Sequence, residues 1–425
     1  MNVSLPRGTR DYGPREAIAL GRMLGAIEET FKRFGFYPLD TPGAELTSTL
    51  NGKAYGADAN KELFVLEGGE EGLRYDFTVP LARFMAMNRD LPLPFKRYQL
   101  GKVWRMDEPQ KMRAREFIQA DIDVVGSSEV ISDAESIAPI AFALDGLGIA
   151  DYTILINSRI VLDSLLGHFG VPKERHMEAI RAIDKLSKIG RGEVSRILEK
   201  LGTDSKNAED LLGFVEQEGA NEEKLTRLGN TISGTKEEIA RLTKLLQLLR
   251  EYGVHSHVSI DFSLARGLDY YTGGVWEFVV YEDGKRLPTI ASGGRYDNLM
   301  EMYSKNSVPA VGTAIGVSRI FEIIYKDNGP RTCSKVHITY IKEENMAYAM
   351  QVAKSIRSAG IYADMDLTKR ALSKQLEYVN SMGIRHAIIL GNQEREAGKI
   401  RLRDMVSGKE EVIDIDEAVK RLKES

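Results

Sequence analysis

Cysteine is almost absent from this chain of 425 residues, which contains only Cys333. One cysteine cannot form a disulfide within the chain, so we expect a reducing, cytoplasmic setting. No segment approaches the roughly 20 consecutive apolar residues that a membrane-spanning helix needs. The polar N-terminal residues also lack the apolar core of a signal peptide. The sequence therefore predicts a cytoplasmic protein without a membrane partner.

Familiar catalytic and metal-binding patterns are missing as well. The six histidines have no acidic or cysteine partners at metal-ligand spacing, so we expect no metal-binding set of side chains. No GxxxxGK[ST], HExxH or GxSxG pattern occurs. The chain carries 58 Lys and Arg against 62 Asp and Glu, a net charge of −4. Any binding of nucleic acid must therefore depend on local patches.

The length and the order of patterns predict several domains. Strand-like segments dominate residues 1–170 and 254–326, which we interpret as two halves of one sheet domain. The intervening residues 171–253 are helical, charged and poor in aromatics, which is typical of an inserted helical module. Residues 333–425 alternate between strands and helices, so they are predicted to form a separate α/β domain after a polar linker.

Some local elements are less regular. The small, polar segment 47–58 is predicted to be a mobile loop. Residues 63–66 and 73–77 are predicted to pair as a hairpin, and 289–292 to form a strand that Gly293-Gly294 interrupts. Thr235 and Glu238 match a capping box at the start of a helix that ends at Gly253.

The stretch from Phe95 to Val125 contains two β-rich runs on either side of the charged segment 105–116. This pattern predicts an antiparallel hairpin with a long, basic tip. Arg105 and Arg113 stand where strand meets loop, which favours fixed guanidinium groups, and their planar forks suit phosphate. The alternative is a solvated surface loop.

Two more stretches carry a chemical signal: LARGLDYYTGG at 264–274 and GTAIGVSR at 312–319. The small residues Gly312, Ala314 and Gly316 alternate with bulkier ones, so a strand would present a flat face. A purine or sugar could lie there, with Arg319 at its edge. The alternative is a glycine-rich strand that packs closely on a helix.

Together these stretches resemble the class II aminoacyl-tRNA synthetases, and specifically the histidyl-tRNA synthetase family. The hairpin resembles motif 2 of that class, 312–319 resembles motif 3, and Pro42 stands where motif 1 has its proline. RGLDYYTG and ASGGRYDNL resemble the two histidine-specific signatures. Asp107 replaces the usual glutamate of motif 2, and Ala314 replaces a glycine of motif 3. The resemblance implies an α+β fold: an antiparallel β-sheet catalytic domain flanked by helices, a helical insertion and a C-terminal α/β anticodon-binding domain.

The resemblance also implies ATP as a substrate with Mg²⁺, L-histidine and tRNA(His) as partners, and a homodimer formed through motif 1. It assigns roles to twelve positions. Arg105 and Arg266 are catalytic; Asp76, Thr78, Arg105, Gln119, Asp123, Arg266, Tyr270 and Tyr271 bind histidine; Arg105, Arg113, Phe117 and Arg319 bind ATP; and Gln110 contacts the tRNA acceptor end.

Two other functions remain open at this stage. One is a catalytically silent paralogue of the kind that serves as regulatory subunit of ATP phosphoribosyltransferase. The arginines of the ATP motifs and the C-terminal domain argue against it, because that family typically lacks both. The other is a synthetase for another amino acid, such as threonine, proline or glycine. The RGLDYYTG stretch argues against that alternative.

Overall fold

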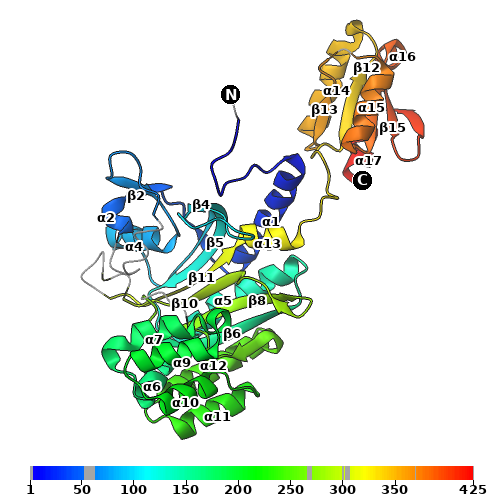
Figure 1. Ribbon diagram of the computed structural model, residues 1–425. Coiled ribbons are helices and arrows are strands. Elements are labelled where there is room, and N and C mark those ends of the chain that lie inside the picture. Colours follow the sequence, from blue (N-terminus) through cyan, green and yellow to red (C-terminus); the bar gives the residue numbers. More distant parts are fainter. Residues whose placement is uncertain are drawn as a thin grey trace. The chain divides into compact units, whose positions relative to one another are not determined.

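The computed structural model describes residues 3–51, 63–265, 270–298, 301, 307–368 and 370–424. The chain folds into two compact units (Figure 1). One comprises Met1–Arg10 and Met23–Ile324, and the other comprises Asp11–Arg22 and Tyr325–Ser425. Among the helices of the described residues, none has the length and apolar character that crossing a bilayer requires. The finer boundaries predicted from the sequence stay a prediction.

The larger unit is built on one nine-stranded sheet. Every pairing from β4 across to β6 is antiparallel, whereas β1 and β7 add parallel strands at the two edges. The prediction of an antiparallel catalytic sheet is therefore confirmed. In spatial order the strands are β1 (Tyr37–Pro38), β4 (Phe95–Trp104), β5 (Glu116–Val125), β11 (Ala310–Gly316), β10 (Ala291–Arg295), β8 (Gly274–Glu282), β6 (Tyr152–Ser158) and β7 (Val258–Ile260), and β9 (Lys285–Arg286) pairs with β8.

The predicted hairpin is present as β4 and β5, which pair along their whole length from Phe95↔Val125 to Trp104↔Glu116. Because side chains alternate along a strand, residues 117, 119, 121 and 123 of β5 share one face. Strand β11 lies on the other side of β5, with Gly312 opposite Asp123 and Gly316 opposite Gln119. The flat strand therefore runs directly beside the functional face of the hairpin.

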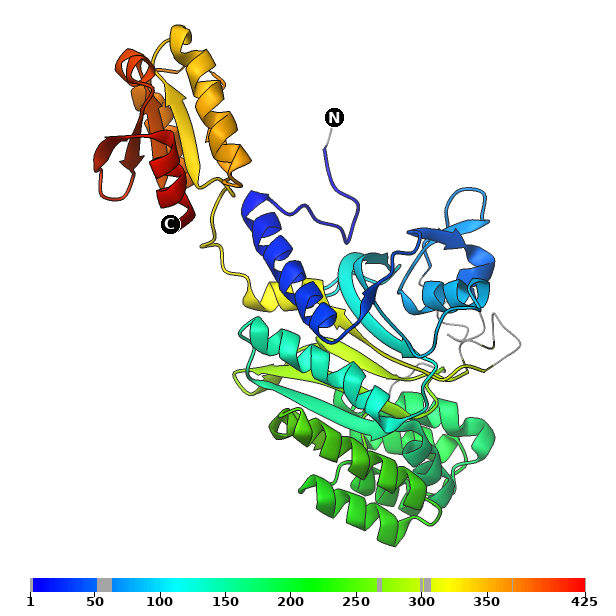
Figure 2. The same ribbon diagram turned by 180° about the vertical axis from the view of Figure 1, so that it is seen from behind.

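Helices cover the sheet in layers. Helix α5 (Val130–Gly146) lies across β5, β11 and β10, and α12 (Lys236–Glu251) packs on α5 from outside (Figure 2). Alanines and isoleucines of α5 supply a wholly buried face, including Ile137 and Ile140. Helix α1 (Pro14–Arg33) packs on β4 through Phe31 and Tyr98, whose ring centroids are 6.1 Å apart. The sheet, α5 and α12 thus form three successive layers.

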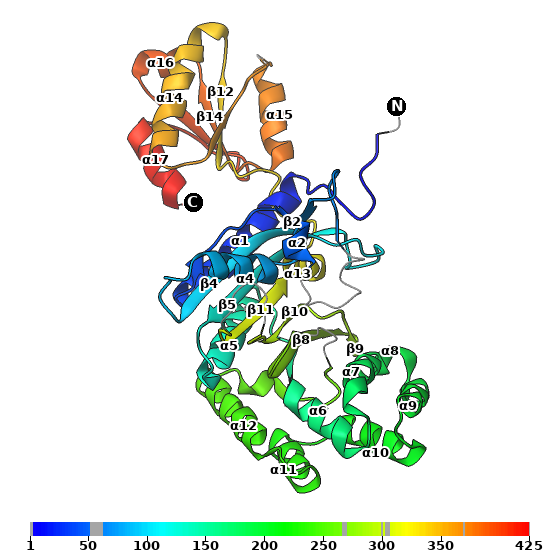
Figure 3. The same ribbon diagram turned by 90° about the vertical axis from the view of Figure 1, so that its left-hand side faces the viewer.

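The region predicted as an inserted module is helical throughout its described elements. Its helices lie together next to the β8–β6 side of the sheet (Figure 3). The predicted capping box is wrong, because the Thr235 hydroxyl donates to the Ile232 carbonyl instead of accepting from the helix. Gly253, with φ of +77°, does end α12 as predicted. The helices of residues 171–253 are α7 (His176–Ile183), α8 (Leu186–Ile189), α9 (Arg191–Lys200), α10 (Ser205–Val215), α11 (Asn221–Thr231) and α12, and α6 (Arg159–His168) precedes this region.

Three local predictions need correction. The predicted return of 63–66 onto the following segment is present, because the Leu66 N–H donates to the Glu71 carbonyl at 2.9 Å and the Leu73 N–H donates to the Phe64 carbonyl at 2.8 Å. However, the strand partner of β3 (Glu71–Leu73) is β2 (Ala44–Leu46), and 63–66 adds a single bridge, Val65 to Gly72. The predicted loop 47–58 begins as a helical turn, α2 (Thr47–Leu50), and its remainder from 52 onwards lies outside the described residues. Helix α4 (Thr78–Met87) follows β3.

The third correction concerns β10, which begins at Ala291 and continues through Gly293-Gly294 instead of stopping there. A Cβ atom at Gly293 would lie 2.2 Å from the Gly312 carbonyl oxygen and 2.6 Å from Trp276 Nε1. Neighbouring strands and a tryptophan therefore require glycine inside the strand. The glycine pair marks close packing, not a turn.

The C-terminal unit is an α/β fold around a five-stranded sheet, in agreement with the prediction for this region. Helix α14 packs on β12 and β13 over a buried apolar core. The strands in spatial order are β13 (Ala363–Met365), β12 (Val336–Tyr340), β14 (His386–Leu390), β15 (Ile400–Asp404) and β16 (Glu410–Ile413). The helices are α14 (Met346–Ser358), α15 (Leu372–Met382), α16 (Asn392–Ala397) and α17 (Ile415–Glu424).

Candidate active site

A cavity of about 1170 Å³ opens over β5 and β11 in the larger unit. Its wall includes the β4–β5 loop, the start of α13 (Val317–Ile324) and residues of α7 and α8. The predicted site residues converge here, although Arg266 lies outside the described residues. The lining includes Asp76, Thr78, Arg105, Gln110, Arg113, Phe117, Gln119, Asp123, Tyr270, Tyr271 and Arg319.

One end of the cavity concentrates positive charge. The Arg319 side chain is held by two backbone carbonyls, with Nε 3.1 Å from the Met112 oxygen and Nη1 2.7 Å from the Thr289 oxygen. Burial lowers the pKa of Arg319, and the positive charges of Arg105 and Arg113 lower it further. Since a guanidinium stays protonated at any physiological pH, this region carries a permanent positive charge that suits an anionic ligand.

Arg105 is held on the floor of this end. Its Nε donates to the Tyr75 carbonyl at 3.0 Å, and its guanidinium carbon lies 5.3 Å from the centroid of the Phe117 ring. Strand β5 positions Phe117 opposite Val103, where the strands of the hairpin meet the β4–β5 loop. The guanidinium therefore has one anchored edge and one ring contact, so its direction is restricted.

The hairpin tip is closed by contacts within itself. Arg113 pairs with Asp107 through two hydrogen bonds of 2.7 and 2.8 Å. Reciprocal backbone bonds of 2.9 and 3.0 Å join Arg113 and Gln110, and Met112 between them adopts a φ of +61°. The Asp107 carboxylate, which replaces a glutamate of motif 2, thus holds Arg113 over the cavity.

The other end of the cavity is acidic and buried. Asp76 accepts hydrogen bonds from the backbone N–H groups of Thr78 and Val79, at 3.1 and 3.2 Å, and so caps α4. Asp121 and Asp123 project from β5, each 3% exposed. Burial raises the pKa of both carboxyl groups, that of Asp121 well above its usual value, and the nearby carboxylate of Asp76 raises both further.

A buried arginine and a tyrosine hold Asp123. Arg97 is fully buried on β4 and lies 2.6 Å from an Asp123 carboxylate oxygen, while the Tyr296 hydroxyl donates to the other oxygen. One guanidinium therefore faces two buried carboxylates. Within the described part of the chain, Gln119 Oε1 and Asp121 Oδ1 are buried without a hydrogen-bond partner. These acceptors and the excess negative charge suit a ligand that carries N–H groups and positive charge.

Sequence reasoning missed Tyr296, Asp121 and Arg97. Tyr296 stands inside the ASGGRYDNL stretch, and its ring meets that of Tyr270 edge-on at 6.0 Å. Asp121 was visible as a member of the alternating face of β5. Arg97 left no signal, because only the β4–β5 register brings it opposite Asp123.

Glycines make room for these side chains. A Cβ atom at Gly312 would lie 1.9 Å from Asp123 Oδ1, and one at Gly294 would lie 2.7 Å from the Tyr271 ring. At Gly316 the nearest atoms would be 3.4 Å or more away. Gly312 is thus required by the carboxylate beside it, whereas a Cβ atom at Gly316 would make ordinary van der Waals contacts with the Ile290 carbonyl oxygen and the Arg319 side chain. The flat face predicted for β11 is therefore required by a steric clash at Gly312 but not at Gly316.

The described residues offer few side chains that could bind a metal ion. Among the described residues, no three His, Cys, Asp or Glu side chains come together as a metal site. Mg²⁺ that travels with a nucleotide needs only one or two carboxylates besides phosphate and water. Asp107 and Glu277 are two carboxylates that line the cavity, and each already pairs with an arginine, Asp107 with Arg113 and Glu277 with Arg286.

The comparisons with known proteins agree over nearly the whole chain. Residues 8–320 match the family model of histidyl-tRNA synthetase, and 335–425 match that of the anticodon binding domain. A histidine–tRNA ligase of Aeropyrum pernix is 36% identical over 424 residues, which cover 98% of this chain and 96% of that protein.

Solved structures are similar in fold. The crystal structure of a histidyl-tRNA synthetase from Nostoc sp. PCC 7120 superposes with a TM-score of 0.87 at 29% identity, covering 100% of this chain and 99% of the other. A Bacillus halodurans chain described as an ATP phosphoribosyltransferase regulatory subunit/histidyl-tRNA synthetase gives 0.77 at 21% identity, covering 92% of this chain and 98% of the other. At that identity the second likeness concerns the fold alone.

Proposed function

The chain belongs to the histidyl-tRNA synthetase family, and from that premise we propose that the cationic and acidic ends of the cavity bind ATP and L-histidine side by side. The function is that of a histidine–tRNA ligase. L-Histidine is activated by ATP to histidyl-adenylate with release of pyrophosphate, and histidine is then transferred to the 3′ end of tRNA(His). The observation that carries the site assignment is the opposite charge of the two cavity ends.

In the first step the histidine carboxylate attacks the α-phosphate of ATP in line, and pyrophosphate leaves. We assign Arg105 to the α-phosphate and the histidine carboxylate, because its guanidinium is anchored by the Tyr75 carbonyl and the Phe117 ring. Arg113 meets the terminal phosphates, and Phe117 and Arg319 enclose the adenine. Such chemistry needs positioning and positive charge more than a protein nucleophile. By family resemblance, Arg266 completes the catalytic pair.

Histidine carries an ammonium group and a ring with two nitrogens, which match the unpaired acceptors of the acidic end. We assign the ammonium group to Asp76, Thr78 and Gln119, and the imidazole to Asp123, Tyr270 and Tyr271. Tyr296 joins the second group because its hydroxyl orients Asp123. A site with buried polar groups rejects side chains that cannot pair with them, often by 10⁴-fold or more.

The second step needs tRNA(His). We propose that Gln110, exposed at the hairpin tip, contacts the acceptor end, and that 171–253 is the inserted module that braces the acceptor arm. Residues 1–170 with 254–326 form the catalytic domain, and 333–425 bind the anticodon. Mg²⁺ bound to the phosphates would offset the triphosphate charge, and Asp107 and Glu277 would hold it on release of Arg113 and Arg286. We further propose a cytoplasmic homodimer formed through motif 1.

Amino-acid-dependent pyrophosphate exchange tests the assignment. We expect histidine to support exchange and each other amino acid to support it at least about 10⁴-fold less well, because the buried polar groups would go unpaired. Addition of tRNA(His) should then yield histidyl-tRNA. Exchange driven by threonine, proline or glycine would contradict the assignment, and histidine binding without exchange would favour the regulatory paralogue.

Replacement of Tyr296 with phenylalanine tests the imidazole end. Loss of the hydroxyl leaves a buried Asp123 oxygen without its donor, a change that costs about 1–3 kcal/mol. We expect the KM for histidine to rise about tenfold or more, with the KM for ATP nearly unchanged. Tyr281, 42% exposed on β8, provides the matched control as Tyr281→Phe. An unaltered KM for histidine in Tyr296→Phe would remove Tyr296 from the site.

A further inference from the structure

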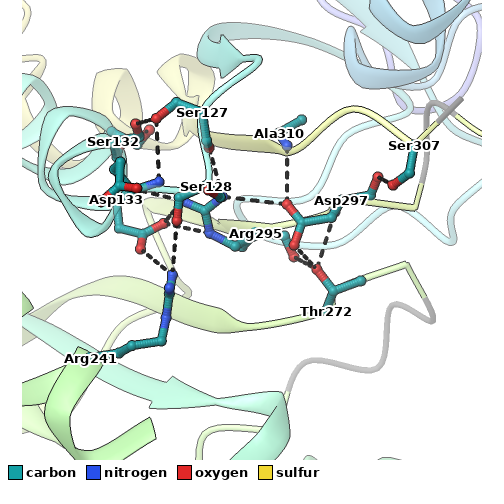
Figure 4. Close-up of polar contacts among 12 residues, drawn as sticks. Ser127, Ser128, Ser132, Asp133, Arg241, Thr272, Arg295, Asp297, Ser307 and Ala310 are labelled. Atoms are coloured by element: carbon teal, nitrogen blue, oxygen red, sulfur yellow. Dashed lines mark hydrogen bonds and ion pairs between the residues drawn. The ribbon is translucent and has the colours of Figure 1, made fainter. Parts of the chain in front are cut away.

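A buried ion pair, Arg295 with Asp133, lies outside the cavity (Figure 4). The side chains are only 4% and 6% exposed, and the Arg295 Nη2 and Nε atoms lie 2.7 and 3.1 Å from Asp133 Oδ1. Arg295 belongs to β10 and Asp133 to the first turn of α5. The pair therefore connects the sheet with the helix layer behind it.

Arg295 also binds the chain between β5 and α5. Its Nη1 donates to the Ser127 carbonyl at 2.9 Å, and its Nη2 lies 3.3 Å from the Glu129 carbonyl. A guanidinium has five N–H donors in a rigid plane, so these acceptors determine its position as well as satisfying it. A lysine could keep the charge but could not reproduce this fork.

The backbone of Arg295 holds the segment that follows the tyrosine pair. The Thr272 N–H donates to the Arg295 carbonyl at 2.8 Å, and the Thr272 hydroxyl donates to Asp297 Oδ2 at 3.0 Å. A Cβ atom at Gly273 would lie 3.3 Å from Arg295 Cδ, so this segment rests on the arginine stem. The position of Tyr270-Tyr271 is thus tied to that of Arg295.

Asp297 carries the connection to the neighbouring strand. Its Oδ1 accepts from the Ala310 N–H at 3.2 Å, where β11 begins, and lies 3.4 Å from Arg295 Nη1. Gly312, two residues further along β11, adjoins the Asp123 carboxylate. The tyrosine pair lies on one side of the proposed imidazole pocket, and β11, which adjoins Asp123, lies on the other. Both are therefore connected by hydrogen bonds to the same residues, Arg295 and Asp297. In contrast, the contacts of Arg105, Arg113 and Arg319 that the structure shows involve none of this cluster.

Arg241 on α12 reaches the same carboxylate from the other side. Its Nη2 lies 3.5 Å from Asp133 Oδ2 and 3.4 Å from the Ser128 carbonyl. Burial raises the pKa of Asp133 to about 6, although Arg295 and Arg241 both oppose the rise. Near pH 7 the carboxylate is therefore ionised between two arginines. Figure 4 shows Asp133 between the two guanidinium groups.

We propose that Arg295 is a positioning residue for histidine, and that Arg241 couples the helices of 171–253 to the imidazole pocket through Asp133. This inference rests on the proposed function of the cavity. A buried ion pair adds little net stability compared with apolar packing, whereas its directional bonds specify geometry. A small displacement of the tyrosine pair would therefore reduce histidine binding without a matching change in ATP binding.

The test measures KM for histidine, KM for ATP and kcat in pyrophosphate exchange. We expect Arg295→Lys to raise the KM for histidine about tenfold or more, and to change the KM for ATP by less than about twofold. Arg241→Met should raise the KM for histidine about threefold. In the double variant the two effects should be non-additive, because both act through Asp133.

Arg196 pairs with Glu193 on the exposed surface of α9, so Arg196→Met is the matched control and should leave all three parameters unchanged. If Arg295→Lys fails to fold, Thr272→Val removes the Thr272 hydroxyl bonds and should also raise the KM for histidine. An unchanged KM for histidine in these variants, or an equal rise in both KM values, would overturn the inference. Absence of histidine-dependent exchange in the unaltered protein would instead overturn the proposed function.

Discussion

Replacement of Arg105 with alanine should lower the rate of histidine-dependent pyrophosphate exchange by about a thousandfold. The guanidinium is anchored to the Tyr75 carbonyl at 3.0 Å and covers the Phe117 ring, so it is already aimed at the position of the reacting phosphate. Removal of one such fixed donor costs other enzymes about 10²–10³ in rate, because no solvent molecule replaces it without reorganisation. Burst measurements of adenylate formation would report the step directly.

Two companion variants make the result specific. Arg105→Lys retains the charge but not the planar fork, and we expect it to recover only part of the lost rate. Arg89→Ala removes an exposed arginine at the end of α4, whose Nε binds only the local Ala86 carbonyl among its described contacts, and it should match the unaltered protein. If Arg105→Ala retained exchange within about tenfold, positive charge at this position would not be central to catalysis.

Replacement of Gly312 with alanine should strongly impair histidine activation, although it adds only a single methyl group. The new Cβ would lie 1.9 Å from Asp123 Oδ1 and 2.7 Å from the Ile122 carbonyl oxygen, so the carboxylate must leave its position. Overpacking of this kind costs about 1–3 kcal/mol, and it would also break the contacts of Asp123 with Arg97 and Tyr296. We expect kcat/KM for histidine to fall about 100-fold, which corresponds to about 2.7 kcal/mol.

The same strand offers a matched control for this prediction. At Gly316 the nearest atoms to a new Cβ would be the Ile290 carbonyl oxygen at 3.4 Å and Arg319 Cδ at 3.5 Å. Gly316→Ala should therefore leave the KM for histidine unchanged, and any effect should concern the KM for ATP. Steady-state exchange and thermal unfolding of both variants would separate lost binding from lost stability. Equal KM values for histidine in the two variants would refute the argument.

Predictions from the sequence succeeded where the interactions are local along the chain, and they were less successful where the interactions join distant segments. The β4–β5 hairpin was predicted from alternation within 31 consecutive positions, from 95 to 125, and its loop supplied the cationic end of the cavity. Several of the errors concerned the partners of elements. Strand β3 pairs along its length with β2 and makes only a bridge and two backbone hydrogen bonds with 63–66, because a pairing of similar short segments is chosen by the packing around them. Thr235 starts the expected helix, yet its hydroxyl binds a preceding carbonyl.

The sequence by itself determined the family, the antiparallel sheet and eleven of the residues that line the cavity, because these follow from short motifs and local periodicity. Only the tertiary structure showed how Asp123 is held by Tyr296, 173 positions away, and how Arg295 meets Asp133 across 162 positions. Such contacts depend on strand register and on exclusion of water, which no local pattern records. The glycine at 312 also depends on a long-range contact. It is required because the neighbouring strand β5 brings the Asp123 carboxylate beside it.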